Sequence, residues 1–156
     1  MIASQNDNKI MNELISNLRK NPSRVEVPVA AAVYDTDLNL VSVAFNAREK
    51  NLDPTAHAEV QALRLAGEKV KNWNLSGFNL YVTLEPCLMC TGAIQQSRIT
   101  KVVFGAFNME RASITCSEVL RNSRQTIEVV GGVCEEECSK FLTEWFNQLR
   151  HSKDSI

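Results

Sequence analysis

The stretch "LYVTLEPCLMCTGAI" at residues 80–94 decides the fold, because it predicts a buried strand that runs directly into a helix. The helix is expected over residues 87–97, and Pro86 stands immediately before it, where proline is well tolerated. Cys87 and Cys90 are three residues apart in the first turn, so their side chains share one face. A helix N-terminus favours thiolates, and two thiolates make half of a tetrahedral zinc site.

A second motif, "PTAHAEV" at residues 54–60, holds one of only two histidines in the chain. The chain has no second Cys-x-x-Cys motif and no histidine pair to close a structural zinc site, so His57 is the candidate third ligand. Three protein ligands leave the fourth position open to water, as in catalytic zinc sites. Glu59 is the candidate catalytic residue, which would take a proton from that water and pass it to a leaving nitrogen.

Other interpretations of the two motifs remain open. A single histidine is most often a surface or capping residue, and Cys-x-x-Cys at a helix start is also typical of thioredoxin-like redox pairs. The redox interpretation leaves "HAE" unexplained, and Leu88 and Met89 stand between the thiols in place of the usual Gly-Pro. Taken together, the two motifs favour a zinc hydrolase.

The remaining elements follow from the spacing of apolar residues. We expect a β-hairpin whose two strands are joined by the turn residues "TDLN", three further strands, and a closing amphipathic helix. The expected helices cover residues 6–20, 56–70, 87–97 and 134–150, with a further helix between the last two strands, and the expected strands cover residues 26–35, 40–45, 78–84, 101–106 and 126–132. This order predicts one mixed sheet covered by helices in a single domain over residues 1–156, with a catalytic core at about 26–132.

Composition narrows the class of protein. The chain has 156 residues, of which 44% are hydrophobic and 22% charged, which suits one globular domain. It has no run of about 20 apolar residues, and its first residues lack a basic region with a long apolar core, so we expect neither a membrane span nor a secretory signal. A cytoplasmic location follows, where five cysteines are not expected to form disulfides. The net charge of −1 means that binding to RNA would need a local basic patch.

Motifs along most of the chain resemble the zinc-dependent cytidine-deaminase-like superfamily, and within it the bacterial tRNA-specific adenosine deaminases, which make inosine at the wobble position. His-x-Glu followed by Pro-Cys-x-x-Cys is the known signature of zinc deaminases. The likeness runs from about residue 26 to 150. It is carried by "EVPVAAAV", "FN", "DPTAHAEVQAL", "LYVTLEPCLMCTGAI", "SRITKVVFGA" and "EEECSKFLTEWF".

The resemblance implies a three-layer α/β/α sandwich with a five-stranded mixed sheet. It implies one Zn²⁺ per chain, held by His57, Cys87 and Cys90, with Glu59 as the proton shuttle. It also implies a homodimer in which a tRNA anticodon stem-loop crosses between subunits. The resemblance implies five substrate contacts. Asn46 would hold the base, and the backbone of Ala58 would lie near the exocyclic amine. The other three contacts are Val29, Asn108 and Phe146.

The chain departs from the family pattern in two places. Ala30 stands where the family usually has glycine. After "VFGA", Phe107 replaces a basic residue and Asn108 an acidic one, in a loop that lies beside the nucleotide in the family. Deamination of a free base or nucleoside, such as guanine or cytosine, is therefore the alternative activity. A non-catalytic RNA-binding subunit is a third possibility, against which the intact Glu59 argues.

Residues outside the two motifs have simpler interpretations. Cys134 and Cys138 are expected to be ordinary helix residues rather than a second metal site, and Cys116 a free thiol in a loop. Trp145 and Phe146 are expected to pack the core, and one of them could also stack on a base. Scattered cations form either a solvated surface or a track for phosphates; they are Arg98, Lys101, Arg111, Arg121, Arg124 and Arg150.

Overall fold

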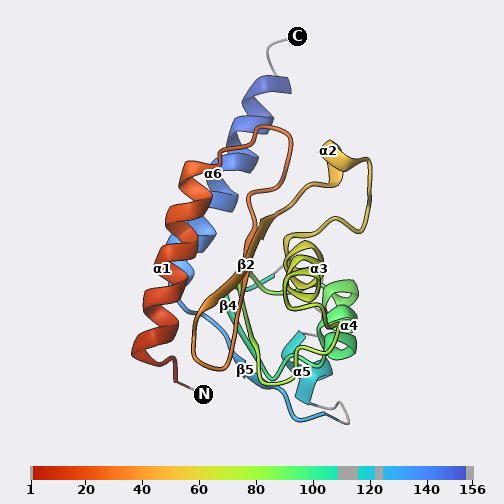
Figure 1. The fold of residues 1–156 in the computed structure, drawn as a ribbon. Helices are drawn as coiled ribbons and strands as arrows, with labels where there is room; N and C mark the ends of the chain where they lie inside the picture. The colour runs from red at the N-terminus through yellow and green to blue at the C-terminus, as the bar shows by residue number, and fades with distance from the viewer. Residues whose placement is uncertain (1, 109–115, 122–124, 154–156) are drawn as a thin grey trace.

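The computed structural model describes residues 2–108, 116–121 and 125–153, and its centre is a five-stranded mixed sheet (Figure 1). The strand order is β2-β1-β3-β4-β5. β1 pairs antiparallel with both β2 and β3, whereas β3, β4 and β5 run parallel to one another. The strands are β1 (Ala30–Tyr34), β2 (Leu40–Phe45), β3 (Asn79–Leu84), β4 (Lys101–Ala106) and β5 (Glu128–Val130).

Helices cover both faces of this sheet, so the expected three-layer α/β/α sandwich is confirmed (Figure 1). One face carries α1 (Gln5–Lys20) and α6 (Glu135–Lys153). The other carries α3 (Ala58–Val70), α4 (Leu88–Ser97) and the short α5 (Cys116–Arg121). Every residue of β1 is buried, because the strand has a neighbour on each side and a helix layer on each face.

A buried polar cluster fixes α1 to the sheet. Ser4 and Asp7 form a reciprocal capping box at the start of α1. The carboxylate of Asp7, only 1% exposed, also accepts hydrogen bonds from the hydroxyl of Tyr81 (2.8 Å) and the ammonium of Lys101 (3.0 Å). Burial alone would raise the pKa of Asp7, but the hydrogen bonds from Ser4, Lys101 and Tyr81 outweigh it and hold the pKa below its ordinary value.

The structure corrects the expected bounds of the first strand. Residues 26–29 lie outside β1, which begins at Ala30, and have no regular secondary structure, with a bend at Glu26. Pro28 has no N–H to give to a neighbouring strand, and the N–H of Val29 turns back to the carbonyl of Val27 (2.9 Å). The hydrogen-bonding groups of this segment are therefore directed elsewhere in the molecule.

Other differences are local. A four-residue helix, α2 (Arg48–Asn51), was not expected, and β5 is shorter than the predicted strand at 126–132. Cys116 begins α5 and is not in a loop, whereas Cys138 lies in α6 as expected. Cys134 lies just before α6 with φ of 54°, so it is not the helix residue that periodicity predicted.

The sequence interpretation of α6 was also partly wrong. Trp145 is half-buried and its indole N–H donates to the carbonyl of Ser23 (3.1 Å), but Phe146 is 39% exposed and its ring meets Trp145 edge-on. An isolated amphipathic pattern does not reveal how wide the covered face of a helix is. Among the described residues, the helices are too short or too polar to cross a bilayer.

Candidate metal centre

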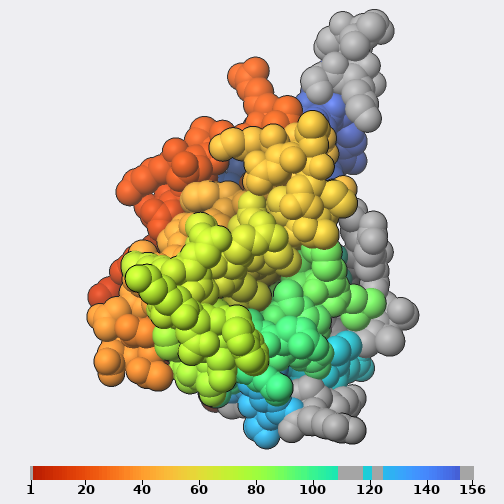
Figure 2. All heavy atoms as spheres, turned by 45° about the vertical axis from the view of Figure 1, so that its right-hand side comes forward, coloured from red at the N-terminus to blue at the C-terminus, as the bar shows by residue number. Residues whose placement is uncertain are grey.

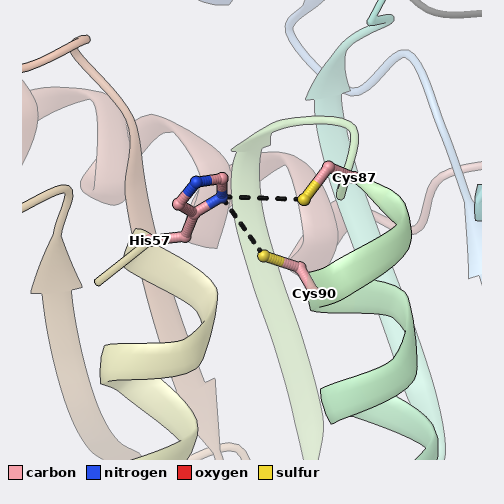
Figure 3. A group of neighbouring side chains, drawn as sticks. All are labelled: His57, Cys87 and Cys90. Atoms are coloured by element: carbon pink, nitrogen blue, oxygen red, sulfur yellow. Dashed lines mark hydrogen bonds between the residues drawn. The ribbon is translucent and has the colours of Figure 1, made fainter. Parts of the chain in front are cut away.

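Two helix starts bring the three predicted ligands together (Figure 3). His57 is the N-cap residue of α3, and Cys87 is the N-cap residue of α4. Neither side chain makes a capping hydrogen bond, so both remain available to a ligand. Cys90 follows in the first turn of α4 and is fully buried, while Cys87 and His57 are half-buried. Both helix N-termini face this cluster and favour negative charge there.

The spacing of the ligand atoms fits a tetrahedral zinc ion. Nδ1 of His57 lies 3.6 Å from Sγ of Cys87 and 3.5 Å from Sγ of Cys90. Zn–N of about 2.05 Å and Zn–S of about 2.3 Å at the tetrahedral angle require an N–S separation of about 3.6 Å. The three ligand atoms all lie within 4.8 Å of one another. The structure thus brings these three residues together, with Nδ1 as the histidine atom that faces the thiols.

The two thiols and the imidazole shift one another's pKa values. A hydrogen bond from Cys90, followed by one with His57, lowers the pKa of Cys87 to about 3, while the thiolate of Cys87 and burial raise the pKa of Cys90 far above its ordinary value. The hydrogen bond to Cys87 raises the pKa of His57. A bound metal would deprotonate both thiols, since a coordinating thiol ionises outright.

Glu59 lies next to the ligands, in the first turn of α3. Its side chain is only 4% exposed, and it interacts with the thiol of Cys90 and with its own backbone N–H. Burial raises the pKa of Glu59 to about 7. The carboxylate is therefore next to the metal cluster, as the His-x-Glu spacing predicted.

Asn46 links the end of β2 to the start of α3. Its Oδ1 accepts the N–H of Ala58 (2.9 Å), and its Nδ2 donates to the carbonyl of Val27 (3.1 Å). Its backbone N–H donates to the carbonyl of Val29 (3.2 Å), and Val29 itself is buried. The predicted contacts Asn46, Ala58 and Val29 therefore form one hydrogen-bonded group next to His57, in which the Ala58 N–H is already bonded to Asn46.

The last two predicted contacts lie in other surroundings. The N–H of Asn108 donates to the carboxylate of Glu85 (3.3 Å), a buried residue of the "EPC" motif. Phe146 lies on α6, where its ring meets that of Trp145 edge-on. The sequence analysis gave no role to Glu85, although its position between β3 and the first cysteine indicated that it lies close to the metal site.

The expected track of cations is only partly described. Lys101 is a structural residue and not a free cation, because its ammonium is paired with Asp7 (3.0 Å) and Glu128 (3.6 Å). Arg150 donates to Asn147 on α6. Arg111, Arg124 and the side chain of Arg121 lie outside the described residues. A phosphate track is therefore not supported by Lys101.

A hollow of about 280 Å³ adjoins Asn46. It does not include the ligand cluster itself. The cations Lys50 and Arg64 and the amide of Gln61 line it, and it is closed on one side by β2. The lining residues are Ala44, Phe45, Asn46, Ala47, Lys50, Gln61, Arg64 and Leu65.

Comparison with known proteins agrees with this architecture and this cluster. The family model for the cytidine and deoxycytidylate deaminase zinc-binding region matches residues 4–106, which contain all three ligands. The chain therefore belongs to this family of zinc-binding deaminases.

Two individual relatives share most of their length with this chain. The tRNA-specific adenosine deaminase of Haemophilus influenzae is 37% identical over 155 residues, covering 97% of this chain and 90% of the relative. The tRNA-specific adenosine deaminase of Bacillus subtilis is 40% identical over 153 residues, covering 94% and 92%.

Solved structures include representatives of two deaminase activities. One, from work on A-to-I editing by tRNA:A34 deaminases, has a TM-score of 0.77 at 30% identity and covers 85% of this chain and 97% of that chain. A guanine deaminase from Nitrosomonas europaea has a TM-score of 0.75 at 26% identity, covering 93% and 86%. The fold is thus shared by enzymes with different substrates.

Proposed function

We propose that this protein is a zinc-dependent hydrolytic deaminase that converts adenosine to inosine at the wobble position of tRNA. The observation that carries the proposal is the meeting of one imidazole and two thiols at tetrahedral spacing, with a buried carboxylate next to them. The tRNA-specific relatives at 37% and 40% identity, aligned over nearly the whole chain, support the choice of substrate.

Each residue has a distinct part in this reaction. His57, Cys87 and Cys90 would hold one zinc ion per chain, which when bound supplies an acidified water as the nucleophile. Glu59 is the proton carrier, which takes a proton from the attacking water and delivers it to the departing amine. Asn46 holds Ala58 and the entrance of α3 in place, and its second amide hydrogen can meet the base.

The partner we propose is a tRNA anticodon stem-loop bound by a homodimer, and tRNA as substrate favours a cytoplasmic location. The whole chain from residue 1 to 156 would form one deaminase domain. A nucleotide must be flipped out of its stack to reach a buried carboxylate, so the enzyme must also grip the flanking backbone. Phosphate contacts release counterions, and we expect activity on RNA to weaken steeply with salt.

One experiment separates the candidate activities. The purified protein is incubated with an anticodon stem-loop that carries adenosine at the wobble position, and separately with adenosine, cytosine and guanine. Inosine in the RNA and no ammonia from the free compounds is the expected result. A stem-loop with guanosine at the wobble position is the matched control.

Free-base deamination is the second candidate, because the guanine deaminase from Nitrosomonas europaea shares the fold at a TM-score of 0.75. Efficient, salt-insensitive turnover of guanine or cytosine with none on RNA would replace the first proposal by this one. RNA binding without any turnover would make the protein a non-catalytic subunit.

A further inference from the structure

The segment of residues 26–29, which precedes β1, is hydrogen-bonded to the loop that leads to His57. Glu26 is 8% exposed, and its two carboxylate oxygens accept the N–H groups of Arg48 (3.1 Å) and Lys50 (2.9 Å). The carbonyls of Val27 and Val29 accept from the side chain and backbone of Asn46. Residues 26–29, which lie outside β1, are therefore hydrogen-bonded to the connection between β2 and α3.

The Glu26 carboxylate accounts for the presence of α2. A four-residue helix does not form by itself, because fixing the first turn costs more than its hydrogen bonds return. The first N–H groups of any helix have no partner within it, and Ala47, the N-cap residue, makes no side-chain cap. Glu26 supplies two charge-assisted acceptors for these groups, which also compensate the burial of its charge.

A short series of backbone hydrogen bonds connects α2 to the metal ligand. Asp53 donates to the carbonyl of Arg48 (3.1 Å), Ala56 to that of Asp53 (3.1 Å), and Ala47 to that of Ala56 (2.9 Å). His57 follows Ala56 directly in the chain. Figure 2 shows this loop, in yellow, on the surface above α3 and next to α4. The position of His57 thus depends on a loop that closes on α2.

We propose that Glu26 is a positioning residue for the metal centre: it holds α2, and through α2 it places His57 at the distance that zinc requires from the two thiols. The inference rests on the proposed zinc site but needs no assumption about the substrate. Residues that orient metal ligands from outside the coordination sphere typically change metal affinity or activity by about 10–100-fold. Glu26 acts on the ligand through backbone bonds and does not touch the metal.

The test compares four proteins: wild type, Glu26→Gln, Glu26→Asp and Glu49→Gln. Glu49 is the matched control, since it is an exposed carboxylate on the same helix. Glu26→Gln keeps one acceptor oxygen but places an amide NH₂ against a backbone N–H. Zinc affinity is measured by competition with a chelating dye, and amide hydrogen exchange is followed at Arg48 and Lys50.

We expect Glu26→Gln to bind zinc about 10-fold more weakly and to lose exchange protection at Arg48 and Lys50, with the sheet amides unchanged. Glu26→Asp keeps both acceptors one methylene further away and should lie between Glu26→Gln and wild type, and Glu49→Gln should match wild type.

Wild-type zinc affinity in Glu26→Gln, or a loss of protection spread evenly over the sheet, would overturn the proposal. If Glu26→Gln does not fold, unchanged zinc affinity in Glu26→Asp overturns it instead. Zinc binding is measured without RNA, so failure of wild type to deaminate the stem-loop would count against the proposed function and not against this role of Glu26.

Discussion

Replacing Glu59 by glutamine should stop the chemistry without disturbing the metal. The carboxylate lies next to the ligands, 4% exposed, and interacts with the thiol of Cys90 and its own backbone N–H. Glutamine has nearly the same shape and retains one acceptor oxygen, so the free energy of unfolding should change by no more than about 1 kcal/mol. It cannot carry a proton between water and the departing amine.

The expected loss in kcat is about 10²–10⁴-fold, the usual contribution of a positioned acid–base group. At 1.36 kcal/mol per tenfold change, this corresponds to about 2.7–5.4 kcal/mol of the barrier. Single-turnover formation of inosine in the stem-loop measures the rate, and metal analysis of the same sample measures zinc. Glu59→Gln should retain the metal of wild type.

Cys87→Ala supplies the contrast, because it removes a ligand whose sulfur lies 3.6 Å from Nδ1 of His57. It should lose zinc and activity together, whereas Glu59→Gln loses activity alone. A Glu59→Gln protein that keeps zinc and works within a few-fold of wild type would refute the assignment of Glu59 as the proton carrier.

Three further predictions concern stability. Removing zinc with a chelator should lower Tm by about 8–16 °C, and adding zinc back should restore it. Zinc at about 1,000 times its Kd contributes about 4 kcal/mol, and the Tm of a domain of this size shifts by about 2–4 °C per kcal/mol. An unchanged Tm would contradict a zinc site that joins α3 to α4. Asp7→Asn should cost about 1.5–3 kcal/mol in denaturant unfolding, since it weakens the charge-assisted hydrogen bonds that the buried carboxylate accepts from Tyr81 and Lys101. The pKa of Asp7 is held below its ordinary value of 3.8, so its contribution to the free energy of unfolding is complete above pH 3.8 and is lost as the pH falls through the folded pKa. The difference in stability between wild type and Asp7→Asn should therefore narrow below about pH 4. A difference that stays constant there would show that the charge is not responsible. Gly105→Ala should cost about 1–3 kcal/mol of unfolding free energy, because the new methyl group would overlap the sulfur of Cys138 and lie 2.8 Å from the carbonyl oxygen of Thr83. Adding Cys138→Ala should recover only part of this loss of stability, and full recovery would mean that the carbonyl contact is harmless.

The amino-acid sequence by itself determined the local features of the metal site. A strand that runs into a helix at Pro86 places Cys87 and Cys90 on one face, because residues three apart in a helix are neighbours whatever surrounds them. The same reasoning placed His57 and Glu59 at a second helix start. Short apolar runs also identified the strands of the mixed sheet, of which only the strand at residues 40–45 alternates between apolar and polar residues.

Only the tertiary structure decided how these local pieces meet. The distances between Nδ1 of His57 and the two sulfurs depend on the strand order that sets α3 beside α4, which no short-range pattern contains. Glu26 was part of an expected strand, and the structure instead directs its carboxylate to the N–H groups of Arg48 and Lys50. Local periodicity reports which residues avoid water, whereas the partner of a buried carboxylate is chosen by whichever unpaired backbone groups the folded chain brings within about 3 Å of it.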